Sequence, residues 1–243
     1  LYILNELFLK KNFLKSILKK YKLFISFWII GSIIVLYLFN DALTPQKKLP
    51  IFQPAMVNYE LVDSTLQFVK KFHKISNFKL INQNGKIITN RDYDNKIYVA
   101  DFFFTTCPTI CPIMTDNMLK IQNKILDDPN VFLLSHTVTP KIDSVGQLKK
   151  YSVEKGVVDS KWNLVTGDKK QIYELARKSY LCVKTDGDGG PYDMIHTENF
   201  ILIDPDRRIR GFYDGTNTKE IKKLIKDISI PVSYTHLTLP TNR

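Results

Sequence analysis

The sequence predicts an α/β domain that follows a single N-terminal apolar helix. The chain has 243 residues and is 44% hydrophobic, which is enough apolar material to bury a full core. From about Asn77 onward, turn signals separate short apolar runs from segments whose apolar residues recur with helical spacing. This alternation is typical of α/β domains. Before it, residues 23–39 form an uncharged apolar stretch.

Residues 23–39, LFISFWIIGSIIVLYLF, are predicted to form one transmembrane helix, at the short end of the length that spans a bilayer. A basic segment, residues 1–22, precedes the stretch, so the positive-inside rule predicts that this segment is cytoplasmic. A cleaved signal peptide is the alternative, but residues 40–43 offer no small-x-small site. We therefore expect an uncleaved single-pass anchor in the inner (cytoplasmic) membrane, with the soluble domain facing the periplasm or cell exterior. The preceding lysines are Lys10, Lys11, Lys15, Lys19, Lys20 and Lys22.

The remaining boundaries follow from changes in composition. Residues 40–76 are expected to form a linker, and residues 77–230 the folded domain. Residues 231–243 abandon the lysine-rich and isoleucine-rich style of the rest and resemble translated adaptor or vector sequence. We expect a non-native tail there, so His236 is not counted as a ligand. The chain begins with Leu1 instead of methionine, which is consistent with a fragment or an alternative start.

Two short strands and a long central strand are predicted at the start of the domain. Residues 78–81 and 86–89 flank an Asn84-Gly85 pair, which favours a hairpin turn. Residues 96–104, KIYVADFFF, form a continuous apolar run suited to a central strand covered on both faces. A helix is expected from about Pro112, because proline suits the first helical turn and the apolar residues beyond it recur near a period of 3.6.

The rest of the domain continues the alternation of strands and helices. The pattern predicts a strand, a helix, a strand, a helix, a two-stranded hairpin and a closing helix: residues 131–137, 144–155, 162–165, 168–180, 197–203 with 208–213, and 218–228. This order fits an elaborated thioredoxin-like fold, with an added N-terminal hairpin and a C-terminal hairpin.

The formal net charge of +11 does not by itself indicate a nucleic-acid-binding protein. Five of these net positive charges lie within residues 1–24. The remainder is scattered, without an arginine-rich stripe interleaved with aromatic residues. We therefore expect no nucleic-acid partner.

The motif that carries chemistry is TTCPTICP, residues 105–112, between the central strand and the following helix. Backbone N–H groups and the helix dipole favour an anion there, so a cysteine in this turn is expected to have a lowered pKa. Three residues separate Cys107 from Cys111, and both sulfurs can face one point. Soft metals, above all Cu(I), prefer thiolate ligands, and one imidazole would complete three-coordination. The pair can also close as a disulfide.

His196 is the candidate third ligand. It precedes an apolar strand and follows a glycine-rich loop, residues 185–191, which can bring a distant histidine over a site. Taken alone, a histidine near a strand start is more often solvated or hydrogen-bonded than metal-bound. His73 is expected at the surface, and His136 is expected to be satisfied within the fold. Three sulfur-containing residues are expected to pack in the core: Met114, Met118 and Cys182.

Four segments carry a resemblance to a known family. DFFFTTCPTICPIM, the strand with SHTVTP, WNLVTGDKKQIYELARKSY and MIHTENFILIDPDRRIRGFYDGT follow one another between Asn77 and Ile228 and resemble the SCO/SenC family of copper proteins. The resemblance implies a thioredoxin-like fold, a membrane anchor, and Cu(I) or Cu(II) held by Cys107, Cys111 and His196.

Two departures from the family pattern matter. Ile195 occupies the position where many members have an aspartate directly before the histidine, and Thr139-Pro140 replaces the Asp-Pro that many show after the middle strand. Neither departure removes a ligand.

The resemblance also implies a function. It points to a metallochaperone rather than an enzyme. Such a metallochaperone would deliver copper to, or maintain the thiols of, the binuclear copper site of cytochrome c oxidase. Its partner would be the copper-accepting subunit of that oxidase. The alternative is an extracytoplasmic thiol-disulfide oxidoreductase, which would need Cys107 and Cys111 but not His196. A peroxidase would need an arginine near the cysteine turn, and none lies near it in sequence. A purely structural domain would tolerate serine at both cysteines.

Overall fold

A computed structural model describes residues 19–43, 48–184, 187, 190 and 193–230. The chain divides after Lys47 into an N-terminal unit, whose described residues include the helix α2, and a second unit that contains the sheet. The predicted tail, including His236, lies outside the described residues.

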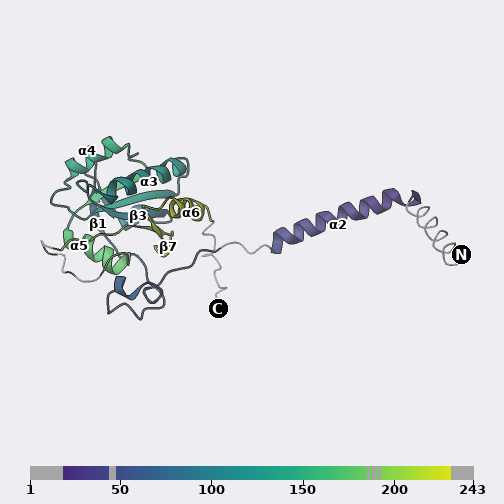
Figure 1. The fold of residues 1–243 in the computed structure, drawn as a ribbon, viewed down its shortest axis with the longest axis horizontal. Coiled ribbons are helices and arrows are strands. Elements are labelled where there is room, and N and C mark those ends of the chain that lie inside the picture. Colours follow the sequence, from purple (N-terminus) through teal and green to yellow (C-terminus); the bar gives the residue numbers. More distant parts are fainter. Residues whose placement is uncertain (1–18, 44–47, 185–186, 188–189, 191–192, 231–243) are drawn as a thin grey trace, which may run out of the picture. The chain divides into compact units, whose positions relative to one another are not determined.

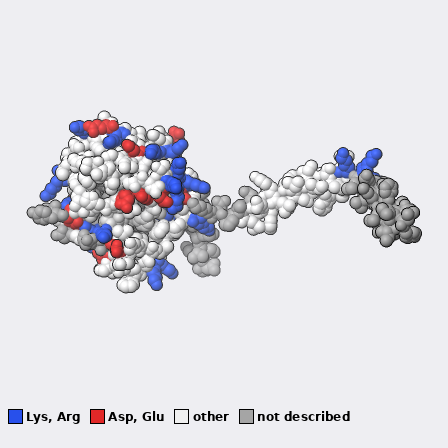
Figure 2. All heavy atoms as spheres, in the orientation of Figure 1, with Lys and Arg blue, Asp and Glu red and all other residues white. Residues whose placement is uncertain are grey.

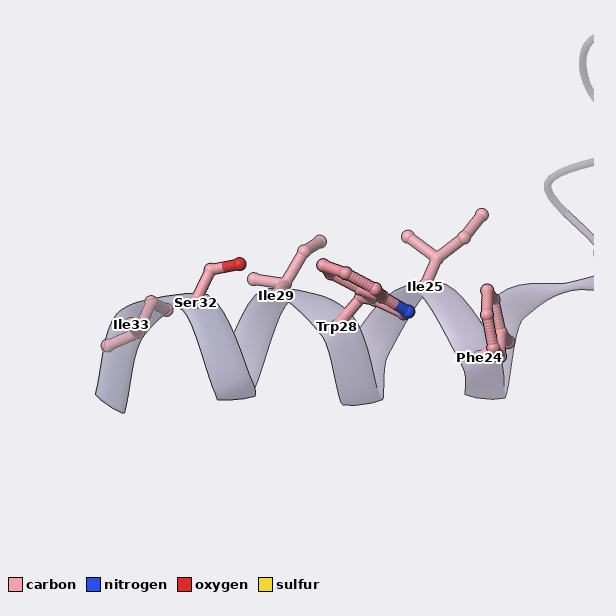
Figure 3. A pocket seen from close by; sticks show the side chains of 6 residues that line it. All are labelled: Phe24, Ile25, Trp28, Ile29, Ser32 and Ile33. Atoms are coloured by element: carbon pink, nitrogen blue, oxygen red, sulfur yellow. The ribbon is translucent and has the colours of Figure 1, made fainter. Parts of the chain in front are cut away.

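The N-terminal unit contains α2, Lys22–Leu43, which covers the predicted anchor. Its 22 residues correspond to a length of roughly 33 Å, close to the thickness of a bilayer hydrocarbon core. The stretch Lys22–Asn40 is long and apolar enough to cross a membrane. Figure 3 shows six side chains along this helix, five of them apolar. In Figure 2, basic side chains gather at the N-terminal end of α2, ahead of a stretch without charge. The helix is a candidate membrane span.

The second unit is built on a seven-stranded mixed sheet with strand order β2-β1-β5-β4-β3-β6-β7. The three central strands β5, β4 and β3 run parallel, whereas β1 and β6 pair with them in the antiparallel direction. The two predicted hairpins, β1 with β2 and β6 with β7, form the two edges. The strands are β1 (Lys79–Asn82), β2 (Ile87–Thr89), β3 (Ile97–Phe103), β4 (Val131–Thr137), β5 (Trp162–Thr166), β6 (Asn199–Ile203) and β7 (Ile209–Asp214).

Helices cover both faces of the sheet (Figure 1). Side chains of α3, α4 and α6 pack in one apolar cluster, and those of α5 and η4 pack in the other. Alternate residues of β3 enter the two clusters, Val99 and Phe103 on one side and Tyr98 and Phe102 on the other. This layered α/β arrangement is the predicted thioredoxin-like fold. The helices are α3 (Ile110–Ile125), α4 (Val145–Lys155), α5 (Lys169–Glu174), the π-helix η4 (Leu175–Ser179) and α6 (Thr218–Ile228).

Side chains and a glycine fix the ends of α4 and α5. The Ser144 side chain caps α4, and Gly156 ends that helix with a φ of 76°, a conformation that glycine adopts at little cost. The Asp168 carboxylate accepts a hydrogen bond from the backbone of Gln171 at 2.8 Å and caps α5. The predicted single helix over residues 168–180 is divided, because its second half is π-helical.

Residues 48–76 differ from the expected linker, because they pack against the sheet unit. They include two short 3-10 helices, η1 (Pro54–Met56) and η2 (Tyr59–Leu61). Val62 is fully buried in the core, and the Phe52 backbone donates to the carbonyl of Ile209 at 2.9 Å. This segment has no helical or strand periodicity, so its order comes from tertiary contacts that composition does not reveal.

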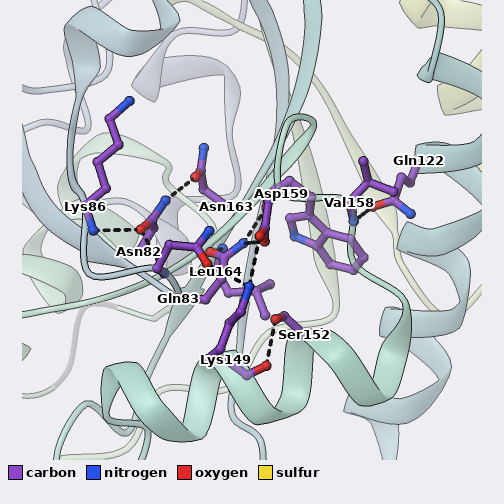
Figure 4. A network of polar contacts seen from close by, with 12 residues as sticks. Asn82, Gln83, Lys86, Gln122, Lys149, Ser152, Val158, Asp159, Asn163 and Leu164 are labelled. Atoms are coloured by element: carbon purple, nitrogen blue, oxygen red, sulfur yellow. Dashed lines mark hydrogen bonds and ion pairs between the residues drawn. The ribbon is translucent and has the colours of Figure 1, made fainter.

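A polar network joins the β1 edge of the sheet to β5 and α4 (Figure 4). Asn82 donates to Asn163 at 2.8 Å, and Gln83 donates to Asp159 at 2.8 Å. Lys149 of α4 pairs with the same Asp159 at 2.9 Å. These contacts fix the N-terminal hairpin in register beside β5.

Candidate metal centre

The two motif cysteines lie at the N-terminal end of α3, directly after β3. The backbone of Cys107 donates to the carbonyl of Phe104 at 3.3 Å, which turns the chain after the strand. Thr109 is the N-cap of α3 and makes no side-chain capping bond, so Cys111 is the second residue of the helix. Pro112 follows in the first turn, where its missing N–H removes no helical hydrogen bond. Cys107 is half-buried and Cys111 is buried.

The two thiols differ strongly in acidity. Burial opposes ionisation of Cys107, but the backbone N–H groups of Cys111 and Thr109, with their side chains, outweigh it and lower the Cys107 pKa to about 7. The Sγ of Cys107 lies 3.7 Å from the Oγ1 of Thr109. Burial raises the pKa of Cys111 to about 12. Near neutral pH, Cys107 is therefore the reactive thiolate and Cys111 a protected thiol.

A fully buried carboxylate, Asp143, holds the chain that leads into the cysteine turn. The backbone and the hydroxyl of Thr105 both donate to Asp143, at 3.2 Å and 2.5 Å. The hydroxyls of Thr137 and Thr139 donate to the same carboxylate. Asp143 thereby ties the end of β3 to the connection after β4, and it fixes the approach to Cys107. The sequence analysis did not predict that Asp143 accepts these hydrogen bonds. The threonines at the ends of two neighbouring strands could have indicated a buried acceptor.

A second buried acid, Asp101, lies on β3 in the same part of the structure. It is 3% exposed, and its Oδ1 has no hydrogen-bond partner among the described residues. Burial raises the Asp101 pKa to about 7, although the hydroxyl of Ser135 partly offsets the effect. The charge of Asp101 also contributes to the raised pKa of Cys111, after burial and Cys107 itself. A single acid within the apolar run KIYVADFFF was the sequence signal.

His196 lies close to the cysteine turn, just before β6. Its ring is exposed and meets the ring of Phe104 edge-on, with 6.2 Å between centroids. Phe104 is also the residue whose carbonyl accepts the backbone hydrogen bond of Cys107. Among the described residues, no three His, Cys, Asp or Glu side chains are gathered at metal-binding distance. The structure therefore brings Cys107 and Cys111 together and places His196 beside their turn, without assembling the trio.

Two further histidines in the described part of the chain, His73 and His136, are held within the fold. His136 is fully buried, its Nδ1 lies 3.3 Å from the carbonyl of Asp101, and burial lowers its pKa to about 4. Its Nε2 has no hydrogen-bond partner among the described residues, so the prediction that this ring is satisfied within the fold holds for one nitrogen only. His73 was predicted at the surface, and this prediction is wrong. It is half-buried, its Nε2 lies 2.8 Å from the carbonyl of Ser179, and burial lowers its pKa. The predicted core residues Met114, Met118 and Cys182 are all buried.

The fold and the cysteine pair define a thioredoxin-like protein with a reactive cysteine before its first sheet-covering helix. Residues 68–230 match the SCO1/SenC family model, and the chain belongs to this family. It is 30% identical over 158 residues to the SCO1 protein homolog of Bacillus subtilis, covering 64% of this chain and 81% of the relative. It is 34% identical over 159 residues to an SCO2-like protein of Rickettsia prowazekii, covering 62% and 74%.

Solved structures agree with this assignment. The fold matches an SCO1/SenC family lipoprotein from Bacillus anthracis with a TM-score of 0.57 and 31% identity, over 64% of this chain and 93% of that one. It matches BsSco, described as a member of the Sco family of cytochrome c oxidase assembly proteins, with a TM-score of 0.54 and 29% identity, over 64% and 93%. Arabidopsis thaliana ScoI, solved with copper bound, matches with a TM-score of 0.50 and 25% identity, over 63% and 96%.

Proposed function

We propose that this chain is a membrane-anchored copper-binding protein that delivers copper to, or maintains the thiols of, the binuclear copper site of cytochrome c oxidase. The observation that carries the proposal is the Cys107 and Cys111 pair at the start of α3, in a chain of the SCO1/SenC family. The copper-bound ScoI structure and the description of BsSco as an oxidase assembly protein support it. The partner is then the copper-accepting subunit of the oxidase.

Cys107, Cys111 and His196 are the proposed ligands, and copper is the cargo they carry. Two thiolates and an imidazole suit copper, in particular Cu(I), as a soft donor set. Cys107 is already acidic, whereas the pKa of Cys111 is raised to about 12. Copper binding must therefore displace the proton of Cys111. His196 must also move from its position against Phe104 toward the two sulfurs.

The anchor and the sidedness of the protein belong to the same proposal. We infer that residues 23–39 of α2 span the inner membrane, with residues 1–22 in the cytoplasm. The sheet unit then faces the periplasm or cell exterior, where the cysteine pair can exist in oxidised or reduced form. The anchor would hold the copper site near a membrane-bound acceptor.

A thiol-disulfide oxidoreductase is the second candidate function, and one observation favours it. The Cys107 pKa of about 7 and the Cys111 pKa of about 12 are the asymmetry expected of an attacking and a resolving cysteine. In that function, Cys107 would form a mixed disulfide with a substrate, and Cys111 would release the reduced substrate by closing the Cys107–Cys111 disulfide.

Copper titration of the reduced full chain in detergent separates these functions. We expect about one copper per chain, loss of binding in Cys107→Ser and Cys111→Ser, and weaker binding in His196→Ala. His73→Ala is the matched control, because this histidine is bonded to Ser179 and should leave copper binding unchanged. Equal copper affinity in His196→Ala and the parent would contradict the three-ligand site. Turnover of a mixed-disulfide substrate by the copper-free chain, undiminished in His196→Ala, would favour the oxidoreductase.

A further inference from the structure

A buried ion pair lies next to the segment that carries His196. The guanidinium of Arg177 holds the carboxylate of Asp193 through two parallel contacts, Nη1 to Oδ2 at 2.7 Å and Nη2 to Oδ1 at 2.8 Å. Both side chains are only 8% exposed. Arg177 lies in η4, the π-helical segment, and it lines the same pocket of about 420 Å³ as His196. Short π-helical segments often occur at functional sites.

The same residues hold the chain on both sides of the glycine-rich stretch. The Nε of Arg177 donates to the carbonyl of Lys184 at 3.1 Å, so one side chain contacts both Lys184 and Asp193. The backbone carbonyl of Asp193 also accepts hydrogen bonds from the Nζ of Lys169 at 2.6 Å and from the hydroxyl of Tyr173 at 3.1 Å. Asp193 is therefore fixed through its side chain and its backbone.

Gly187 shows how closely the chain packs on this pair. Its φ of 137° is unfavourable for residues with a side chain, and a Cβ added there would lie 2.6 Å from the Oδ1 of Asp193. The nearest side-chain atom to that Cβ belongs to Arg177. Only a residue without a side chain fits against the ion pair at this position.

Only five residues, 194–198, separate Asp193 from β6, so the anchored Asp193 restricts the position of His196. Ile195 is 4% exposed and Thr197 is 6% exposed, whereas His196 between them is exposed. This alternation is that of an extended backbone with its neighbours anchored in the protein. The imidazole is consequently presented to solvent from a segment that is held at Asp193 on one side and by β6 on the other.

We propose that Arg177 is a positioning residue for copper binding: through Asp193, it fixes the segment that presents His196 to the cysteine pair. This inference rests on the proposed function, because it assigns Arg177 to the geometry of the third ligand. A purely structural role is the competing explanation. A buried ion pair adds little to the stability of the fold, because the cost of desolvating both charges offsets much of their attraction. Its two parallel hydrogen bonds nevertheless fix the relative position of the two side chains.

The test measures Cu(I) affinity of the full chain by competition with a chromophoric chelator. Arg177→Gln removes the ion pair, and Gly187→Ala disturbs it sterically while keeping both charges. Arg210→Gln is the matched control, because it removes another buried Arg–Asp pair, with Asp204 at 3.1 Å, at the opposite end of β6. Each variant is also made in the His196→Ala background.

We expect Arg177→Gln and Gly187→Ala to weaken copper binding by about 10–100-fold, as is usual for residues that orient metal ligands. Arg210→Gln should bind copper as the parent does. In the His196→Ala background, Arg177→Gln should have no further effect, because the ligand it positions is gone. Cys107 should be alkylated at the parental rate in both variants.

Other outcomes would overturn the inference in distinguishable ways. If Arg177→Gln binds copper with parental affinity, the positioning role is refuted and the proposed function stands. The same holds if the losses of copper-binding free energy in Arg177→Gln and His196→Ala simply add in the double variant. If Arg177→Gln fails to fold, parental affinity in Gly187→Ala would refute it equally. Absence of copper binding by the parent chain would refute both proposals.

Discussion

At the scale of single residues, the local structure of the cysteine turn gives two chemically identical side chains different acidities. Cys107 precedes α3, where backbone N–H groups stabilise its thiolate, whereas Cys111 is buried within the first turn and keeps its proton. The sequence predicts a reactive cysteine in this turn but not which of the two it is. The difference comes from burial, which depends on how α3 packs on the sheet.

Alkylation of the reduced chain by iodoacetamide tests this division. Cys107 should react first, and its rate should rise with pH to half-maximum near 7, because only the thiolate attacks. Cys111 should stay unmodified under native conditions. Peptide mapping by mass spectrometry identifies the labelled residue, and a half-maximum near pH 9 would contradict the stabilised thiolate.

Asp143→Ala should loosen the cysteine turn and destabilise the fold. The hydroxyls of Thr105, Thr137 and Thr139 would lose their buried acceptor, at a cost of about 1–3 kcal/mol in the free energy of unfolding. The alkylation rate of Cys107 should also change, because its approach is no longer fixed. Asp168→Ala removes a helix cap worth about 1 kcal/mol on another element and is the control, with unchanged Cys107 reactivity.

Asp101→Asn should alter the pH dependence of stability. In the folded chain the carboxyl keeps its proton up to a pKa of about 7, whereas the unfolded chain loses it near the ordinary value of 3.8. The folded state therefore binds more protons across this window, and parental stability falls as pH rises from 4 to 7. The variant lacks this loss, so its stability relative to the parent should increase with pH in urea unfolding. A constant difference between pH 4 and pH 8 would contradict the buried, protonated acid.

At the scale of elements, the sequence predicts well what periodicity and capping determine. The closing helix α6 has the predicted limits, and β3 and β4 agree within a residue at either end. Long-range contacts account for the rest. The π-helix η4 and the packing of residues 48–76 depend on partners far away in sequence, such as the bond from Phe52 to Ile209. Likewise, the position of His196 follows from Arg177 and Asp193, not from any local pattern.

Val62→Ala tests whether residues 48–76 are part of the folded unit. Val62 is fully buried, so the loss of two methyl groups should lower the free energy of unfolding by roughly 1–2 kcal/mol. Phe68→Ala is the control, since its side chain is 85% exposed and should change stability by less than about 0.5 kcal/mol. Equal stability of parent and Val62→Ala in thermal unfolding would show that this segment does not contribute to the core.

At the scale of the whole molecule, the proposed role joins a candidate membrane span to a thioredoxin-like copper site. Within the span Lys22–Asn40 the only charged residue is the first, Lys22, and the large side chains are exposed along its length. That is unlike a core helix, which buries an apolar face.

Ile30→Lys with Ile33→Lys should weaken membrane insertion of the full chain. Each lysine near the centre of the span costs about 2.5–3.5 kcal/mol on insertion scales. The parent should resist carbonate extraction from membranes, whereas the double variant should be released. Phe68→Lys with Val153→Lys is the matched control, because it adds the same two charges at exposed positions of the sheet unit and should leave the chain in the membrane. Release of the intact parent chain by carbonate would contradict the anchor.

The central claim is that Cys107, Cys111 and His196 together bind copper, and X-ray absorption spectroscopy of the Cu(I)-loaded full chain tests it most directly. The parent should show two sulfur scatterers and one imidazole bound to copper, and His196→Ala should lose the imidazole while keeping both sulfurs. A spectrum without sulfur ligands, or one that is unchanged in His196→Ala, would contradict the three-residue site.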